Sequence, residues 1–552
     1  MKIVFLNIYP KSGMARYLLS SYALSAYLNK WWDGKKKLET VVLNFSTTAS
    51  ADKIVSAVCK ALETDSCISF DDGPKLAGFS IYSWNAETIK QVMGRIRNEA
   101  PNIIHIMGGP EVSLSAMTAL AMQGLGDYYI EGEGEVKLLR LLRHIAESDY
   151  ASGHIAGPPR GVARRIYGGD KKHHLLYEQE DAKADPETLP PVYLSGGIEK
   201  RLYEGQQAYL ETQRGCRNRC AYCVYHKGLS GVTHYPLSRV EKELRHLILE
   251  AGVSALRIID AAFTSDLPRA AKIIDCISAI RTENNGVLPW IYWEFIYSSV
   301  DEDFIRKVAT LKNRPRISNT ESVRPKNAPQ MYTDLLTDYT VINCVGVQSL
   351  NPESLKAVRR PALSLTRFER FMELVNAYNI VLKIDLILGL PYETISSYFE
   401  GISRVIPYLR HTDHVLNIHR LQMLPGSELE EQAEVFGILY SENAPHIVWE
   451  TDAMPCSDMR HAARLTAVFF RIFNSPLREL FYDAYSRFAT QDGVSLKTML
   501  EILLEKAYKS LVTKTSLLCI HDDVDDDYWN DAVFWEIPSE WAAGAITSLT
   551  FK

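Results

Sequence analysis

The sequence lacks any apolar run long enough to cross a lipid bilayer, which needs about 20 consecutive residues. It also lacks a surplus of basic residues, because 61 Lys and Arg stand against 67 Asp and Glu, for a net charge of −6. That balance gives no electrostatic reason to expect a nucleic-acid partner. The first residues, Met1 to Tyr9, have a short apolar run without a cleavage site and predict a strand rather than a signal peptide. We therefore expect a cytoplasmic protein with no membrane or nucleic-acid partner.

Cysteine is also scarce, with nine residues in 552. An odd number, three of them clustered, does not suit a disulfide framework and favours a reducing compartment. The six scattered cysteines are expected to be small core residues or spare thiols. They are Cys59, Cys67, Cys276, Cys344, Cys456 and Cys519.

The three clustered cysteines, Cys216, Cys220 and Cys223, have CxxxCxxC spacing. Three thiolates this close together in a loop can hold three irons of a cubane cluster, which leaves the fourth iron open to a substrate or cofactor. A tetrahedral zinc site is the alternative, and His226 offers it a fourth ligand. From these residues alone, both kinds of site stay open.

The segment in front of the cysteines predicts where this site lies in the fold. Residues 208–212 have the pattern of a strand, and Gly215 allows the chain to turn sharply out of it. A loop at the carboxyl end of a strand is where a β/α barrel places its chemistry. We therefore expect the cysteine loop at the mouth of a barrel.

The cysteine spacing, with Tyr222 just before the third cysteine, resembles the radical S-adenosylmethionine (SAM) enzymes. In that family the open iron chelates the amino and carboxylate groups of SAM. The resemblance implies a [4Fe-4S] cluster on Cys216, Cys220 and Cys223. It also implies that Tyr222 presents its backbone or ring to the adenine of SAM.

The N-terminal part of the chain alternates strands with helices, which predicts an open, doubly wound parallel sheet. No GxGxxG follows its first strand, so a dinucleotide ligand is disfavoured. We expect strands over 3–8, 40–45, 76–82, 103–107 and 128–130, and helices over 14–32, 51–62, 87–98 and 133–146.

Three loops follow the third, fourth and fifth of these strands, at the edge where such sheets bind ligands. Their glycines permit close approach of the backbone to a ligand, although glycines that only make turns are the simpler interpretation. The residues expected to bind a cofactor there are Ser80, Ser83, Asn85, Gly108, Gly109, Pro110, Glu111, Glu131, Gly132, Glu133 and Gly134.

Beside the cysteine loop, the GGPEVS and GEGE loops resemble those of the cobalamin-binding radical SAM enzymes. In that family this domain holds cobalamin against the barrel mouth. One difference from the wider cobalamin-domain pattern is that residues 1–150 contain no DxHxxG motif. His105 lies inside the fourth strand and is expected to be a satisfied core histidine, so no protein imidazole is expected on cobalt.

The remaining chain divides into three predicted parts. Residues 149–206 are rich in Gly and Pro and predict a linker with a hairpin, following a cobalamin-binding domain over 1–148. Residues 207–430 match the partial (β/α)6 barrel of the family, and 431–552 predict a helical substrate-binding region. The long segment 310–339 is a candidate lid. The barrel strands are expected over 208–212, 255–259, 290–296, 341–347, 381–388 and 415–421.

Four polar residues near the ends of the barrel strands are candidate SAM contacts. Glu294 lies in an apolar strand and needs a partner, for which a salt bridge and SAM are both open. Gln348 and Ser349 end the fourth barrel strand, where family members contact the ribose or carboxylate of SAM. Asp385 either pairs with Lys383 on the same face of its strand or faces the substrate.

The resemblance implies a cobalamin-dependent radical SAM methyltransferase, with an electron donor such as flavodoxin or ferredoxin. Cleavage of SAM would give a 5′-deoxyadenosyl radical, which abstracts hydrogen from an unactivated carbon that then takes the methyl group of methylcobalamin. The substrate is open: a natural-product intermediate, a peptide or a phosphorus-containing metabolite. The alternatives are a family member that uses cobalamin for ring contraction or cyclisation, and a non-catalytic cobalamin sensor.

Overall fold

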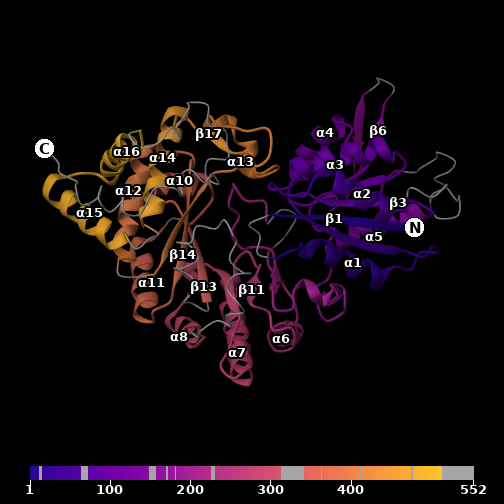
Figure 1. Cartoon of the computed structure of the whole chain (residues 1–552), viewed down its shortest axis with the longest axis horizontal. Coiled ribbons are helices and arrows are strands. Elements are labelled where there is room, and N and C mark those ends of the chain that lie inside the picture. The colour runs from indigo at the N-terminus through magenta and orange to yellow at the C-terminus, as the bar shows by residue number, and fades with distance from the viewer. Residues whose placement is uncertain are drawn as a thin grey trace.

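The structure is a computed structural model, shown in Figure 1. It describes residues 1–10, 15–63, 73–147, 157–168, 172–180, 182–225, 231–311, 341–361, 363–410, 413–473 and 477–512. Four residues or segments of the sequence analysis lie wholly or largely outside these ranges: Cys67, His226, Cys519 and the candidate lid 310–339.

The first sheet has seven strands in the order β2-β1-β3-β4-β5-β6-β7. Strands β1 to β5 pair in parallel in the flavodoxin-like order 2-1-3-4-5, which confirms the predicted doubly wound sheet. The strands are β1 (Lys2–Tyr9), β2 (Glu39–Ser46), β3 (Lys75–Ser80), β4 (Ile104–Gly108), β5 (Tyr128–Ile130), β6 (Val162–Tyr167) and β7 (His173–Leu176).

Five helices accompany this sheet, and two of them differ from the sequence prediction. The first begins at Leu19, not at residue 14, because Leu18 is extended and its carbonyl accepts a hydrogen bond from Asn7 Nδ2 at 3.2 Å. One helix was not predicted, and Ser113 caps it by accepting from the Ala116 N–H. The helices are α1 (Leu19–Trp31), α2 (Ala51–Ala61), α3 (Ala86–Glu99), α4 (Leu114–Met122) and α5 (Glu135–Glu147).

The hairpin predicted in the linker is present and belongs to the first sheet. Strand β6 pairs antiparallel with β5, and β7 pairs antiparallel with β6. Farther along the linker, the Tyr193 hydroxyl lies 2.9 Å from the Tyr17 hydroxyl and donates to the carbonyl of Tyr209 in the second sheet at 2.6 Å. One apolar core therefore continues from the first sheet through this segment into the second.

The second sheet has six parallel strands in the order β15-β14-β13-β12-β11-β8. Among the described residues its two edge strands, β8 and β15, do not pair with each other, so the barrel is partial as predicted. The strands are β8 (Gln207–Leu210), β11 (Ala255–Ile258), β12 (Trp290–Phe295), β13 (Val341–Gln348), β14 (Leu382–Leu388) and β15 (Val415–Arg420). The helices are α6 (Leu237–Arg245), α7 (Leu267–Glu283), α8 (Glu302–Thr310), α10 (Pro352–Ala357), α11 (Leu365–Ala377) and α12 (Ile395–Val405).

The three long helices of the C-terminal part pack on the barrel, on the side away from the first sheet (Figure 1). The Tyr398 hydroxyl of α12 lies 3.0 Å from the Thr466 hydroxyl, deep in this contact. No helix in the described ranges is long and apolar enough to cross a membrane. The elements are α13 (Glu428–Glu431), β16 (Leu439–Tyr440), β17 (Val448–Glu450), α14 (Cys456–Phe473), α15 (Arg478–Asp492) and α16 (Leu496–Val512).

Candidate functional site

The chain enters the cysteine loop through a turn that requires glycine. Gly215 has a φ of +89°, and a Cβ there would overlap the carbonyl oxygen of Gly231. Just before it, β9 (Gln213–Arg214) pairs antiparallel with β10 (Thr233–His234) and closes the base of the loop. The turn expected at Gly215 is confirmed, and the cysteines follow the carboxyl end of β8.

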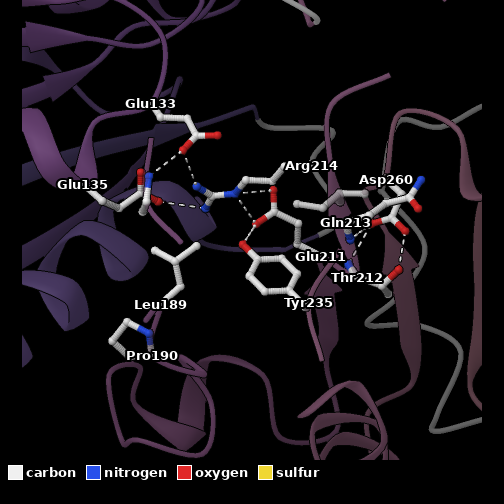
Figure 2. Close-up of polar contacts among 12 residues, drawn as sticks. Glu133, Glu135, Leu189, Pro190, Glu211, Thr212, Gln213, Arg214, Tyr235 and Asp260 are labelled. Atoms are coloured by element: carbon white, nitrogen blue, oxygen red, sulfur yellow. Dashed lines mark hydrogen bonds and ion pairs between the residues drawn. The ribbon is translucent and has the colours of Figure 1, made fainter. Parts of the chain in front are cut away.

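A buried carboxylate from the neighbouring strand anchors the start of this loop (Figure 2). Asp260, 1% exposed, accepts hydrogen bonds from Thr212 N at 2.7 Å, Thr212 Oγ1 at 2.5 Å and Gln213 N at 3.2 Å. Burial raises the pKa of Asp260 to about 7, and the donors of Thr212 and Gln213 partly offset that rise. Asp260 therefore ties the ends of β8 and β11 together directly beside the cysteines.

The cysteine sulfurs have hydrogen-bond donors that suit thiolates. Arg360 Nη1 lies 3.4 Å from Cys220 Sγ, and the Tyr225 N–H donates to Cys223 Sγ at 3.4 Å. Burial raises the pKa of the Cys223 thiol to about 11. The donors at Cys220 and Cys223 suit iron-bound thiolates.

The arrangement of the sulfurs bears on the zinc alternative. The described ranges contain no group of three His, Cys, Asp or Glu side chains placed to hold one metal ion. A tetrahedral zinc site needs its ligands to converge on one point, whereas each cysteine of a cubane binds a different iron. His226, the fourth ligand of the zinc alternative, lies outside the described ranges, so both kinds of site stay open at this point.

Ionisable side chains from several strands gather inside the barrel. Glu294 on β12, Cys344 on β13 and Lys383 on β14 are in register on adjacent strands. Burial raises the pKa of Glu294, the charge of Asp385 raises it further, and Arg257 and Lys383 partly offset both. Both partners considered for Glu294, a salt bridge and SAM, stay open.

Asp385 is the most fully partnered carboxylate of this group. It accepts from Asn417 Nδ2 at 2.7 Å and Cys344 Sγ at 2.9 Å, and Lys383 Nζ lies 3.4 Å away. Burial acts to raise the pKa of Asp385, but the hydrogen bond and charge of His419 and the charge of Lys383 outweigh it and hold that pKa low. Pairing with Lys383 is confirmed. Cys344, expected to be a core residue or spare thiol, is buried and belongs to this polar group.

The end of β13 carries two more predicted residues. Gln348 has a φ of +71°, a strained conformation of the kind that clusters at ligand sites. The Ser349 hydroxyl donates to Glu393 Oε1 at 2.5 Å. Glu393 is 2% exposed, its other oxygen has no partner among the described residues, and burial raises its pKa to about 8.

The sequence analysis missed Arg360 and Glu393. Arg360 reaches Cys220 and the carbonyl of Gly346 from the segment after α10, and half-buried Tyr222 lies beside it. Neither residue belongs to a motif, and each acquires a role only because its loop returns to the barrel mouth. A guanidinium in this position suits a carboxylate or a thiolate.

In the predicted cofactor loops of the first sheet, several side chains are engaged by protein partners, Asn85 and Glu111 among them. Asn85 accepts from the Tyr82 N–H at 2.8 Å and donates to the carbonyl of Ile8 at 3.2 Å, which fixes the loop after β3. Glu111 lies 2.9 Å from His446 Nε2 in the C-terminal part. Both residues shape the loops, and their contact with a cofactor stays a prediction.

Other features of the same loops suit a large ligand. Gly132 has a φ of +70°, and a Cβ there would meet no atom nearer than 3.9 Å, so its backbone is open to approach. Trp84 is 45% exposed and stacks on Tyr82 with ring centroids 4.4 Å apart. An open glycine backbone on one loop and an exposed indole on another suit a broad, partly apolar cofactor. Gly109, by contrast, is needed for packing, because a Cβ there would lie 2.5 Å from Ile81 O.

His105 is a core residue, as expected. It is 1% exposed, its ring meets Phe79 edge-to-face at 5.3 Å, and burial lowers its pKa to about 3. The expectation that the ring nitrogens of His105 are hydrogen-bonded is wrong in part, because Nε2 has no hydrogen-bond partner among the described residues. The ring is held inside the sheet, and it is not presented to the loops.

Comparison with known protein families gives two matches, one in the region of the first sheet and one in the barrel. Residues 69–142 match the B12 binding domain family, and residues 210–400 match the Radical SAM superfamily. The chain therefore has a B12-binding domain followed by a radical SAM domain. A radical SAM domain implies a [4Fe-4S] cluster and SAM, and the other domain implies cobalamin, so the expected cofactors are confirmed at the level of the domains.

Two curated relatives are similar to this chain along much of its length. The cobalamin-dependent radical SAM methyltransferase TokK of Streptomyces tokunonensis is 26% identical over 69% of this chain and 54% of its own. The 2-(S-pantetheinyl)-carbapenam-3-carboxylate methyltransferase of Streptantibioticus cattleyicolor is 24% identical over 66% and 49%. The chain thus spans about half the length of these relatives.

Among solved structures, the radical SAM methyltransferase TsrM of Kitasatospora setae has a similar fold. With tryptophan and a SAM analogue bound, it aligns over 80% of this chain and 78% of its own, with a TM-score of 0.55 and 16% identity. A second TsrM structure, with cobalamin and a [4Fe-4S] cluster bound, has a TM-score of 0.54. Both alignments show that this chain shares the fold of TsrM.

The position of His105 leads to a prediction about cobalt. We expect cobalamin to bind with its own base displaced and with no protein imidazole on the metal, because His105 is enclosed in the sheet and no DxHxxG is present in residues 1–150. Electron paramagnetic resonance of the cob(II)alamin form reports an axial nitrogen directly. Nitrogen splitting of the cobalt lines that disappears in His105→Ala would contradict this expectation.

Proposed function

We propose that this radical SAM protein is a cobalamin-dependent methyltransferase. Its proposed substrate is a natural-product intermediate or peptide, methylated at an unactivated carbon or at phosphorus. The observation that carries the proposal is the meeting of the two cofactor regions. Arg214, two residues before the first cysteine, contacts Glu133 and Glu135 of the loop after β5. A methyl donor and a SAM-cleaving cluster can share one substrate only if their sites face each other in this way.

The names of the relatives support the same class of reaction. TokK is a methyltransferase, and the Streptantibioticus enzyme methylates 2-(S-pantetheinyl)-carbapenam-3-carboxylate. TsrM is a methyltransferase with tryptophan as substrate. These are different small molecules, so the comparisons support the reaction class and leave the substrate of this protein open.

The protein's own contribution would be to position the cofactors and the substrate and to exclude water from them. When bound, the cluster, SAM and cobalamin together supply radical hydrogen abstraction and a transferable methyl group. We propose that Cys216, Cys220 and Cys223 ligate iron and that the strand ends carrying Glu294 and Gln348 orient SAM. The Gly132 backbone and its neighbouring loops would hold cobalamin.

We further propose domain boundaries and partners. Residues 1–148 form the cobalamin-binding domain, 149–206 a linker whose hairpin extends the first sheet, 207–430 the barrel and 431–552 the substrate-binding region. Reductive cleavage of SAM consumes one electron, which a low-potential donor such as flavodoxin or ferredoxin would supply. The substrate would enter between the loops of the two sheets.

Product stoichiometry tests the proposed function. Radical methylation of a saturated carbon uses one SAM at the cluster and a second SAM to renew the methyl group. We therefore expect one 5′-deoxyadenosine and one S-adenosylhomocysteine per methylated product, after subtraction of uncoupled cleavage. The measurement is anaerobic incubation of the reconstituted protein with candidate extracts, followed by mass spectrometry.

The other outcomes separate the alternatives. S-adenosylhomocysteine alone would indicate methylation of a nucleophilic atom without hydrogen abstraction. 5′-Deoxyadenosine without S-adenosylhomocysteine, and a product without an added methyl group, would indicate ring contraction or cyclisation. Cobalamin binding that does not depend on the cluster, with neither nucleoside formed, would indicate a sensor.

A further inference from the structure

Arg214 is surrounded by three carboxylates that come from the two sheets (Figure 2). Its Nη2 lies 2.8 Å from Glu135 Oε1, and its Nη1 lies 3.5 Å from Glu133 Oε2. Its Nε donates to both oxygens of Glu211 at 3.1 Å. Glu133 and Glu135 belong to the loop after β5 and the first turn of α5, whereas Glu211 follows β8. One guanidinium therefore joins the cobalamin-binding domain to the barrel.

The contact is enclosed, which makes its geometry specific. The side chains of Glu135 and Arg214 are 6% and 17% exposed. The Tyr235 hydroxyl donates to Glu211 Oε2 at 2.6 Å, and its ring lies 5.9 Å from the Arg214 guanidinium. Buried charges are tolerated only when they are paired and hydrogen-bonded, so neither sheet can shift here without breaking several interactions together.

Both ends of this contact are anchored. On the barrel side, Asp260 holds Thr212 and Gln213, directly before Arg214. On the other side, Glu135 lies in the first turn of α5, which packs beside α1 under the first sheet. Arg214 is also only two residues from Cys216. Movement of the loop after β5 would therefore displace the cysteine loop as well.

We propose that Arg214 is a positioning residue that holds the cobalamin-binding loop after β5 at a fixed separation from the cluster loop. This proposal rests on the proposed function in assigning the two loops to cofactors. A planar guanidinium is required, because three carboxylates in different directions need its fork of N–H donors, which the single ammonium of lysine cannot reproduce. Coupling of SAM cleavage to methyl transfer depends on that separation.

Arg239 provides a matched control. Its guanidinium lies 4.2 Å from the centre of the Tyr235 ring, and it pairs with Glu243 at 3.0 Å. It also donates to the carbonyl of Leu189 at 2.8 Å, and among the described residues no contact joins it to the loop after β5. Replacing it removes a half-buried arginine beside the same tyrosine without breaking the contact between the two loops.

Hydrogen exchange of the protein loaded with cluster and cobalamin tests the proposal. In Arg214→Gln we expect amide exchange to accelerate together in residues 128–140 and 207–225, by about fivefold or more, because the paired loops loosen as a unit. In Arg239→Gln we expect residues 128–140 to exchange as in the wild type. Unchanged exchange of residues 128–140 in Arg214→Gln would overturn the proposal, whether or not the protein is a methyltransferase.

Two further variants keep the test decisive if Arg214→Gln is unstable. Glu135→Gln removes one carboxylate and should accelerate exchange in the same two segments, and Arg214→Lys should restore the charge without restoring slow exchange. Where methyl transfer is measurable, Arg214→Gln should form more 5′-deoxyadenosine per methylated product at an unchanged iron content. A loss of iron in step with the loss of coupling would show a merely structural role.

Discussion

Cys220→Ala should form no 5′-deoxyadenosine above background when it is incubated with SAM and a reductant. The reason is that each cysteine of the loop would bind a different iron of the proposed cluster, so loss of one would leave two protein ligands for the whole cluster. Cys220 is 5% exposed and its sulfur accepts a hydrogen bond from Arg360, so no neighbouring thiol can take its place without moving the loop. The same loss is expected for Cys216→Ala and Cys223→Ala.

The control for this prediction is Cys276→Ala. Cys276 lies on α7, away from the loop, and its loss should leave both iron and SAM cleavage unchanged. Anaerobically purified wild type should hold about four irons per cluster. If Cys220→Ala retained 5′-deoxyadenosine formation, the assignment of the cluster to these three cysteines would be wrong.

The second large effect is expected for Asp260→Ala. Its removal leaves three buried donors on Thr212 and Gln213 without an acceptor, and each unsatisfied donor costs about 1–3 kcal/mol. The start of the cysteine loop would then lose its link to β11. We expect a lower melting temperature and a large loss of iron after reconstitution, measured by differential scanning calorimetry and by iron and sulfide content.

Asp301→Ala separates this effect from the loss of an ordinary capping carboxylate. Asp301 caps α8 by accepting from the Phe304 N–H at 2.8 Å, and it is exposed. Loss of such a cap costs about 1 kcal/mol, so iron content should be unchanged. Full iron content in Asp260→Ala, with the melting temperature of Asp301→Ala, would contradict the anchoring role.

Elements with regular patterns were predicted with close bounds. The apolar run 3–8 became β1 (Lys2–Tyr9), because a strand buried on both faces is apolar throughout. The Ala51 helix appeared as α2 (Ala51–Ala61), because burial on one face leaves a clear period in the sequence. Elements whose bounds depend on contacts with distant segments were missed or misplaced. α1 starts late because Asn7 holds the carbonyl of Leu18, a contact between segments that no local pattern reveals.

In the candidate site, too, local features were predicted and contacts between distant residues were not. The cysteine spacing and the turn at Gly215 are local, so the sequence predicted them. The partners of the acidic loops were not predictable, because Glu111 meets His446 at a sequence separation of 335 residues. Arg360 reaches Cys220 across 140 residues, and it carries no motif of its own.

The sequence by itself determined the type of chemistry: three cysteines on one loop after a strand, the two alternating α/β patterns and the absence of DxHxxG. These are short-range features, in which residue type and spacing decide the outcome. Only the tertiary structure decided how the two sheets meet. Arg214 forms ion pairs with Glu133, Glu135 and Glu211. These buried charges stabilise each other only when both sheets are folded and packed together. Spacing cannot encode such an arrangement, because its partners come from separate sheets.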